Sequence, residues 1–229
     1  MCNRYGYLAP VSRLEDEFSI LHAPLTWADG RVSNLQPRDE IRPTNTAPIL
    51  RPLDPANPSA GLELAELRWW LVPFFHKKPL SEWKAMCTNC KSETVDTTPA
   101  FREAYRRRRC IVPATHFFEW TALDLAKPKG PKRKWRVSAA GREIFYFAGL
   151  WDRAHPEGHD GPLESFTLAT CAPGEDVRPY HHRQPVILTG WGGGRSSSAS
   201  ESTVGSGVWP VMPVLHRPDG SGRSRPSRP

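Results

Sequence analysis

A cysteine occupies the second position of this 229-residue chain, in the opening Met1-Cys2-Asn3-Arg4-Tyr5. Because the Cys2 side chain is small, we expect Met1 to be removed, which leaves a free α-amine and a free thiol on adjacent carbons. The amine of such a 1,2-aminothiol can condense with an aldehyde, and the thiol can close onto the imine to give a five-membered thiazolidine. The reference pKa values, about 7.7–8.0 for the amine and about 8.5 for the thiol, leave a reactive fraction of both groups at neutral pH. The alternative is an arbitrary residue near a flexible terminus.

Two further residues have chemistry that suits such a reaction. Glu119 lies in the aromatic segment 117–120 (FFEW), where burial would raise the pKa of its carboxyl group and make it a general acid or base. His181, in segment 180–185 (YHHRQP), is a candidate proton shuttle at the entrance to a strand. The alternatives are a glutamate on the solvent face of an edge strand and a solvated loop histidine.

The charge distribution favours a polyanionic partner. The net charge is +7, and two clusters are strongly basic, 106–109 (RRRR) and 127–136 (KPKGPKRKWR). Basic clusters bind nucleic acid through phosphate contacts and counterion release. Nine tryptophans and nine phenylalanines add rings on which bases can stack, although most should be core residues. A solvated charged face and a charged hairpin loop are the alternatives for the two clusters.

The composition indicates a soluble globular protein. Hydrophobic residues make up 38% of the chain and charged residues 24%. We see no run of about 18 apolar residues and no basic region followed by an apolar stretch, so we expect neither a membrane span nor a signal peptide. The five cysteines are irregularly spaced, which indicates reduced thiols and a cytoplasmic protein.

The hydrophobic pattern predicts few helices and many strands. A capping box at 12–15 and apolar residues at helical spacing predict a short helix over 13–20. A second helix begins at Thr98-Pro99 and carries the arginine run on its last turn. Loops and short strands are expected over 24–62, with further strands at 66–72, 110–113, 116–120, 135–138, 144–151 and 165–171, and segment 127–134 as a connection. This pattern indicates a β-rich α+β fold.

The composition changes sharply after Leu188. Residues 189–229 are dominated by Gly, Ser, Pro and Arg. Such a segment has too little apolar surface to offset its ordering entropy. We therefore divide the chain into a domain over 1–188 and a tail over 189–229 that we expect to be largely disordered, with a short contact over 208–215.

Short motifs between Met1 and about Leu188 together resemble the SOS response-associated peptidase family, whose domain is called SRAP. The pieces are M-C-x-R-Y at 1–5, R-P-T-x-T-A-P at 42–48, a variant of W-G-L-V-P-x-W at 69–75, a variant of N-A-R-x-E-T at 89–94, P-A-F-R at 99–102, R-R-C-x-V-P-A at 108–114, F-x-E-W at 117–120, A-G-L-W at 148–151 and H-x-R-x-P at 181–185. Their order and spacing, rather than any one piece, carry the resemblance. It implies mainly antiparallel strands in a barrel-like core with a few short helices.

Members of this family shield abasic sites in single-stranded DNA, and the resemblance assigns roles residue by residue. Cys2 would attach to the aldehyde of the ring-opened abasic sugar and would also act in removing Met1, which explains the word peptidase. Asn89 would hold the amine or the sugar, Glu119 would move protons during imine formation and ring closure, and His181 would assist sugar ring opening and the reverse reaction. DNA contacts are expected from Arg4, Asn45, Trp69, Lys91 and Arg183. No metal or other cofactor is implied, and we expect a cytoplasmic monomer, associated with the nucleoid when bound to DNA.

The sequence departs from the family pattern at several positions. Asn3 and Trp70 replace glycines, Cys90-Lys91 replaces Ala-Arg, His182 replaces an acidic residue, and the tail over 189–229 replaces a final helix and strand. Lys91 keeps the charge of the arginine but loses its bidentate geometry. These changes leave open a degraded family member that binds DNA without crosslinking.

Two other classes compete with this interpretation. Class II glutamine amidotransferases also expose an N-terminal cysteine, whose thiol attacks an amide, and glutaminase activity would identify one. A zinc-binding module is the second, with Cys87-x-x-Cys90 completed by Cys110, Cys171 or a histidine. A single C-x-x-C without a second pair is a weak zinc signal.

Overall fold

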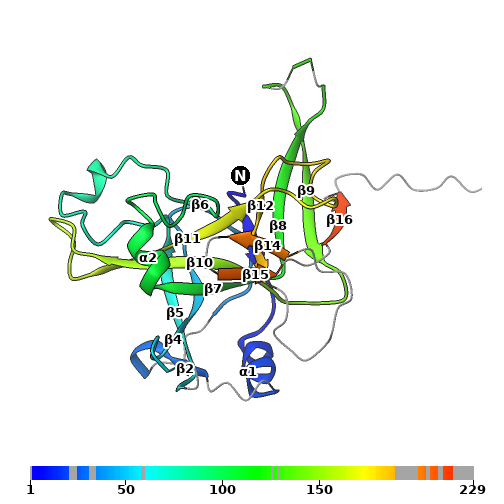
Figure 1. Cartoon of the computed structure of the whole chain (residues 1–229). Helices are drawn as coiled ribbons and strands as arrows, with labels where there is room; N and C mark the ends of the chain where they lie inside the picture. Colours follow the sequence, from blue (N-terminus) through cyan, green and yellow to red (C-terminus); the bar gives the residue numbers. More distant parts are fainter. Residues whose placement is uncertain are drawn as a thin grey trace, which may run out of the picture.

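The computed structural model describes residues 2–20, 25–30, 35–57, 60–124, 126–127, 129–188, 201–204, 207–210 and 214–218. These residues form mainly strands, with two short α-helices, α1 (Val11–Ile20) and α2 (Arg102–Arg107), and short 3-10 turns at Ala28–Gly30 and Leu80–Glu82 (Figure 1). The expected β-rich α+β fold is confirmed. No helix in this described part has the length and apolar character that crossing a bilayer requires.

Five strands close into a barrel: β4 (Thr46–Pro52), β5 (Leu62–Trp69), β7 (Arg109–Ala114), β10 (Phe145–Ala154) and β11 (Leu163–Cys171). Four of the five pairings are antiparallel, and β5 pairs with β11 in parallel. A ring with an odd number of strands cannot alternate direction throughout, so one parallel pair is required. Four short strands extend this sheet: β2 (Leu25–Trp27), β6 (Asn89–Lys91), β12 (Gln184–Pro185) and β13 (Ile187–Leu188). The expected barrel-like core is therefore confirmed.

A second sheet has the order β16 (Val214–Pro218), β9 (Lys132–Ala139), β8 (His116–Ala122), β1 (Tyr5–Tyr7) and β3 (Arg38–Ile41). Strands β8 and β9 form a long hairpin that projects from the body of the molecule (Figure 1). Strands β14 (Glu201–Val204) and β15 (Gly207–Pro210) pair with each other. Three described strands, β14, β15 and β16, therefore lie within the segment 189–229, which we expected to be largely disordered. The other residues of this segment lie outside the described ones.

Buried aromatic rings join the N-terminal strand to the barrel. Tyr5 on β1 is fully buried, with ring centroids 5.2 Å from Trp69 and 5.7 Å from Phe147. Trp69 is also fully buried, lies parallel to Phe166 and donates its indole N–H to the carbonyl of Thr88 at 2.8 Å. Each buried ring contributes about 1.5–3 kcal/mol. This packing holds the chain immediately after Cys2 against the barrel.

Both expected helices form, with different starts. Helix α1 begins at Val11, before the expected cap, and buries Leu14 and Phe18 as the spacing predicts. Helix α2 begins at Arg102 rather than at Thr98, because the Thr98 hydroxyl donates to the carbonyl of Thr94 and belongs to a preceding turn. The arginine run reaches the last turn of α2, as expected.

The strands lie at the expected positions, except that the strand expected over 66–72 ends earlier than expected. The five strands expected between 110 and 171 are present as β7 to β11, with ends that differ by a few residues. The strand expected over 66–72 is β5, which begins earlier and ends at Trp69. Trp70 has φ of 117°, a conformation that breaks a strand and that side chains rarely adopt. This is where the family pattern has glycine, and the indole of Trp70 donates to the carbonyl of Ala85 at 2.8 Å.

Thr44 is a second residue with positive φ, at 77°, in the exposed turn before β4. A β-branched residue in the left-handed region costs about 1–2 kcal/mol, whereas asparagine tolerates this region. Thr44→Asn should therefore raise the free energy of unfolding by about 1 kcal/mol in a denaturant titration. Thr46→Asn, at an exposed strand position, is the matched control and should not stabilise. Equal effects of the two changes would show that backbone strain at Thr44 is not the cause.

Candidate active site

Cys2 lies at the junction of the barrel and the second sheet. Its side chain is 1% exposed, and its thiol donates to the carbonyl of Arg4 at 3.3 Å. Burial raises the pKa of the thiol well above its usual range, and the nearby charge of Glu119 raises it further. The thiol is therefore held protonated next to a carboxyl group that can exchange its proton.

Asn89, on β6, binds the backbone of Cys2 directly. Its amide Nδ2 donates to the Cys2 carbonyl at 2.9 Å and lies 3.2 Å from the side-chain oxygen of Asn3. The Thr88 hydroxyl also donates to this Asn3 oxygen, at 3.3 Å. Asn3, which replaces a glycine of the family pattern, thus adds an anchor between the N-terminal segment and β6. The Asn89 side-chain oxygen is buried and has no hydrogen-bond partner among the described residues.

Glu119 is buried on β8, with 3% of its side chain exposed. Desolvation by burial raises the pKa of its carboxyl group to about 7, so it is partly protonated at neutral pH. Its Oε1 is buried without a hydrogen-bond partner in the described part of the chain. A carboxyl group with this pKa both donates and accepts protons near pH 7, as general acid–base catalysis requires.

His181 approaches Glu119 from the loop before β12. Its Nε2 lies 4.0 Å from Oε2 of Glu119, and its Nδ1 accepts from the backbone N–H of Arg183 at 3.0 Å. Desolvation by burial is the main cause that lowers the pKa of His181, to about 4, and the charge of His182 lowers it further. The ring is therefore neutral at physiological pH, and its Nε2 faces Glu119.

His182 stacks on His181 at a ring-centroid distance of 4.3 Å and is exposed. The family pattern has an acidic residue at this position. A carboxylate beside the ring would stabilise the imidazolium, so His182→Glu should raise the pKa of His181 by about 1. An NMR titration of the His181 ring measures this change. His159→Glu, at an exposed position elsewhere, should leave the His181 titration unchanged, and an unchanged His182→Glu titration would contradict the prediction.

The structure thus brings the four expected catalytic residues together. Asn89 holds the Cys2 backbone, the charge of Glu119 acts on the Cys2 thiol, and His181 lies beside Glu119. They come from four separate segments: the N-terminus, β6, β8 and the loop before β12. The arrangement places an amine-bearing cysteine, a proton-exchanging carboxyl group and a neutral imidazole in one site, which suits carbonyl condensation chemistry.

Arg4 and Lys91, two of the expected DNA contacts, have exposed side-chain surface. The Arg4 side chain is 38% exposed, with its guanidinium 3.4 Å from Glu40 and 5.1 Å from the centroid of the Trp120 ring. Lys91 is exposed at the end of β6. Trp120, in the F-x-E-W motif, is partly exposed, and its ring lies under the Arg4 guanidinium.

The other three expected DNA contacts have structural partners. Trp69 has no exposed surface, so the expectation that it contacts DNA is wrong for this conformation: its ring belongs to the core. The Arg183 guanidinium makes two contacts with Glu93, at 2.6 and 2.8 Å, and also donates to the carbonyl of Thr170. Asn45 is half-buried, and its side-chain oxygen accepts from the N–H of Arg42 within a tight turn. Contacts of Arg183 and Asn45 with DNA stay predictions.

The cysteines do not support the zinc alternative. Cys87 and Cys90 are buried free thiols, and burial raises the pKa of Cys87 to about 11 and of Cys90 to about 12. Among the described residues, no group of three or more His, Cys, Asp or Glu side chains is placed to hold a metal ion. The C-x-x-C spacing therefore reflects two buried core positions.

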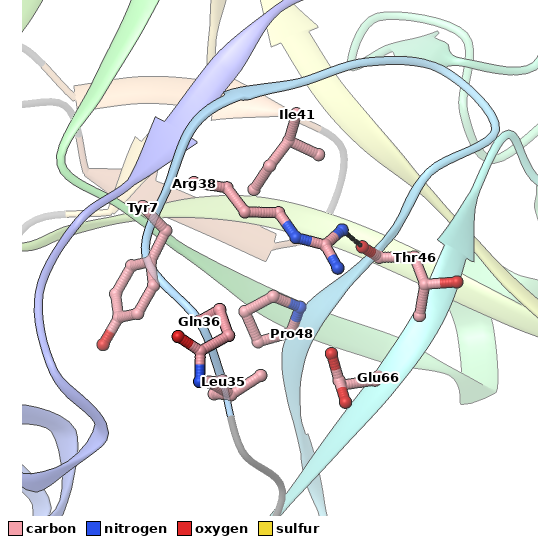
Figure 2. Close-up of a pocket in the computed structure, with 8 residues that line it drawn as sticks. All are labelled: Tyr7, Leu35, Gln36, Arg38, Ile41, Thr46, Pro48 and Glu66. Carbon is pink, nitrogen blue, oxygen red and sulfur yellow. Dashed lines mark hydrogen bonds between the residues drawn. The ribbon is translucent and has the colours of Figure 1, made fainter.

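A cavity of about 50 Å³ lies elsewhere, between β1, β3, β4 and β5. Figure 2 shows its eight lining residues, with the Arg38 guanidinium donating to the carbonyl of Thr46 at 2.8 Å. They are Tyr7, Leu35, Gln36, Arg38, Ile41, Thr46, Pro48 and Glu66. None of the four candidate catalytic residues lines it, and it is much smaller than typical ligand pockets. The candidate site is therefore the junction around Cys2.

Comparisons with known proteins find relatives of this chain. The abasic site processing protein YoqW of Bacillus subtilis (strain 168) is 32% identical over 191 residues, which cover 82% of this chain and 76% of that protein. The abasic site processing protein YoaM of the same organism is 34% identical over 190 residues, covering 82% and 75%. A crystal structure of a Bacteroides thetaiotaomicron protein shares the fold, with a TM-score of 0.66, 23% identity and coverage of 82% and 77%.

A family model matches most of the chain. It is the model of the SOS response associated peptidase (SRAP), and the match spans residues 1–192. All four residues of the candidate site lie within this match, as do the motifs on which the resemblance depends. This chain therefore belongs to the SRAP family.

Proposed function

We propose that this protein processes abasic sites in single-stranded DNA by forming a covalent thiazolidine with them through Cys2. The observation that carries the proposal is the Asn89 hydrogen bond to the Cys2 carbonyl, which fixes the N-terminal residue beside Glu119 and His181. Two relatives with 32% and 34% identity have the name abasic site processing protein. An abasic sugar in its ring-opened form supplies the aldehyde that a 1,2-aminothiol requires.

The reaction balances without an oxidant or another reactant. The Cys2 amine adds to the aldehyde carbon, and the carbinolamine loses water to give an imine. The Cys2 thiol then adds to the imine carbon, and its proton passes to the nitrogen, which closes the thiazolidine. Glu119, with a pKa of about 7, donates the proton that the departing water takes and accepts the thiol proton. His181 assists opening of the sugar ring and the reverse reaction.

Removal of Met1 must come before this chemistry, because only then does Cys2 carry a free amine. We propose that the Cys2 thiol attacks the carbonyl carbon of Met1, so that the Met1–Cys2 amide bond breaks, a thioester forms and the Cys2 nitrogen takes up the thiol proton as a free amine. Water then hydrolyses the thioester, which releases methionine and restores the thiol. The intact mass of the purified protein, with and without Cys2, would test this step. Retention of Met1 only when Cys2 is replaced is the expected result; equal removal from both chains would assign it to another enzyme.

The charge and the exposed side chains of the protein indicate the partner that it binds. The net charge of +7 favours a polyanion, and partly exposed aromatic and basic groups near Cys2, Arg4 and Trp120 among them, suit a single strand with little sequence preference. We propose that the protein acts as a cytoplasmic monomer that reaches the nucleoid by binding damaged DNA. Size-exclusion chromatography with light scattering would test the monomer.

The decisive experiment is a denaturing gel of the protein with a single-stranded oligonucleotide that carries one abasic site. A band that survives heat and denaturant, with the mass of protein plus DNA minus one water, is the expected result. Blocking the aldehyde with methoxyamine beforehand should prevent it. Absence of the band, with Met1 already removed, would exclude the crosslinking function.

The second candidate is a protein that binds DNA without crosslinking. The buried Cys2 thiol, whose pKa is raised, favours this alternative because a protonated thiol is a weak nucleophile. A shift on a native gel, without the band on the denaturing gel, would identify it.

A further inference from the structure

The β8–β9 hairpin carries cations in two different environments. On one face, Lys134 lies 2.6 Å from Glu40 and Arg136 lies 3.1 Å from Asp39. Both acids belong to β3, so these pairs fasten the hairpin to its own sheet. Lys134 and Arg136 therefore contribute to the packing of the hairpin on its own sheet.

The other face of the hairpin carries a cation without an acidic partner. Arg133 is exposed, and no acidic group among the described residues forms an ion pair with it. Its guanidinium instead lies 5.6 Å from the centroid of the Trp135 ring, a cation–π contact. By strand alternation Arg133 and Trp135 share a face, and Trp135 lies directly opposite Glu119 in the register. This face is therefore continuous with the candidate active site.

Trp135 also links the hairpin to His181. Its ring is 4.6 Å from that of Tyr180, the residue before His181, with an interplanar angle of 62°. The Trp135 indole donates to the Thr121 hydroxyl at 2.9 Å, which fixes the ring, and both aromatic residues are half-exposed. A strand leaving the site between Glu119 and His181 meets these rings first and Arg133 next.

Two more cations lie farther out along the hairpin. Lys127 and Lys129 are exposed, and within the described part of the chain neither forms an ion pair. From Glu119 to the end of β8 the strand rises about 10 Å, so these lysines lie beyond the reach of a nucleotide held at Cys2. Unpaired cations together with aromatic rings are what non-specific single-strand binding requires.

We propose that Lys127 and Lys129 of the loop between β8 and β9, together with Arg133 and Trp135 of β9, form a second binding surface for single-stranded nucleic acid. It holds the phosphates of the same strand several nucleotides away from Cys2. This proposal rests on the proposed function for the identity of the ligand. It predicts that affinity depends on strand length beyond the few nucleotides that the Cys2 site covers.

The test compares two triple variants of equal charge change in the full chain. Lys127→Gln/Lys129→Gln/Arg133→Gln removes the hairpin cations. Arg102→Gln/Arg107→Gln/Arg109→Gln removes three exposed arginines on and after α2, which lies well apart from the hairpin (Figure 1). Fluorescence anisotropy with undamaged single strands of about 5 and about 25 nucleotides gives the dissociation constants over a range of salt concentrations.

On the long strand, the hairpin variant should reduce the slope of log affinity against log salt by about 2, from three lost phosphate contacts. Its affinity for the short strand, and the affinity of the α2 variant for both strands, should match the wild type. An unchanged slope in the hairpin variant, or an equal loss in the α2 variant, overturns the proposal. Crosslinking to a short strand with an abasic site tests the proposed function separately. If the wild type forms no adduct but shows the hairpin effect, only the proposed crosslinking function is excluded.

Discussion

Cys2→Ala should form no adduct with abasic DNA that survives denaturation. The alanine chain has no thiol, and because it is expected to retain Met1 its free amine belongs to Met1, so it can form at most an imine, which water hydrolyses. The wild type should convert a large part of a limiting oligonucleotide, so the expected loss of adduct is complete within the detection limit of the gel. Trapping with borohydride would reveal any imine on the Met1 amine of the variant and show that the aldehyde still reaches the N-terminus.

Cys110→Ala is the matched control for this change. Cys110 is also a buried free thiol, 5% exposed on β7, and burial raises its pKa as it does that of Cys2. Both changes remove one sulfur from a buried site, but only Cys2 can carry the terminal amine. Cys110→Ala should retain the adduct. A surviving adduct in Cys2→Ala, or its loss in a folded Cys110→Ala chain, would contradict the assignment of Cys2.

Glu119→Gln should slow crosslinking by about 10²–10⁴-fold at pH 7, the usual range for loss of a general acid or base. The amide keeps the shape of the side chain but cannot exchange a proton with water, thiol or imine. The wild-type rate should also change with a midpoint near pH 7, where Glu119 titrates, and the variant should lack this limb. Single-turnover rates between pH 5 and pH 9 measure both effects. Glu15→Gln, at an exposed position on α1, should leave both unchanged.

Glu119→Gln should also raise the free energy of unfolding at alkaline pH, relative to the wild type. Burial raises the pKa of Glu119 from 4.5 to about 7 in the folded state, so the folded chain keeps a proton that the unfolded chain loses. Stability from this group is therefore complete below about pH 4.5 and is lost as the pH rises through 7, by about 3 kcal/mol in all. Glu119→Gln should not show this loss. Denaturant titrations at pH 5 and pH 8 would reveal it, and parallel changes in both proteins would show that Glu119 is not responsible.

Cys2→Ala and Glu119→Gln together distinguish a loss of crosslinking chemistry from a loss of DNA binding. Neither change alters the exposed cations of the β8–β9 hairpin, so both proteins should keep wild-type affinity for undamaged single strands. A loss of this affinity in either variant would indicate that the change disturbs the fold around β1 and β8. In that case the missing adduct would not identify a catalytic role.

The sequence by itself determined which residues can react. An amine-bearing thiol, a carboxyl group among aromatic residues and a loop histidine could each be named from residue type and neighbours alone. Alternation and turn residues also predicted the run of strands from β7 to β11 and the buried face of α1. These features are local, because side-chain chemistry and the period of a strand or helix depend on nearby residues.

Long-range packing decided the rest. The parallel pairing of β5 with β11 joins residues about 100 positions apart, and no local pattern encodes it. The sequence alone is compatible with Trp69 stacking on a base, but in the fold Tyr5 and Phe166 enclose it in the core. The contacts of Arg183 with Glu93, 90 positions away, also exist only in the folded chain.

In the candidate active site, too, the sequence determines some properties and the fold determines others. Residue types fixed its possible chemistry, whereas the pKa of about 7 at Glu119 comes from burial between the barrel and the second sheet. The two basic clusters look alike in the sequence. The sequence placed the arginine run on the last turn of a helix, but only the fold shows that Arg133 of the other cluster shares a face with Glu119, whereas Lys134 and Arg136 lie on the opposite face, because strand register decides which side chains share a surface.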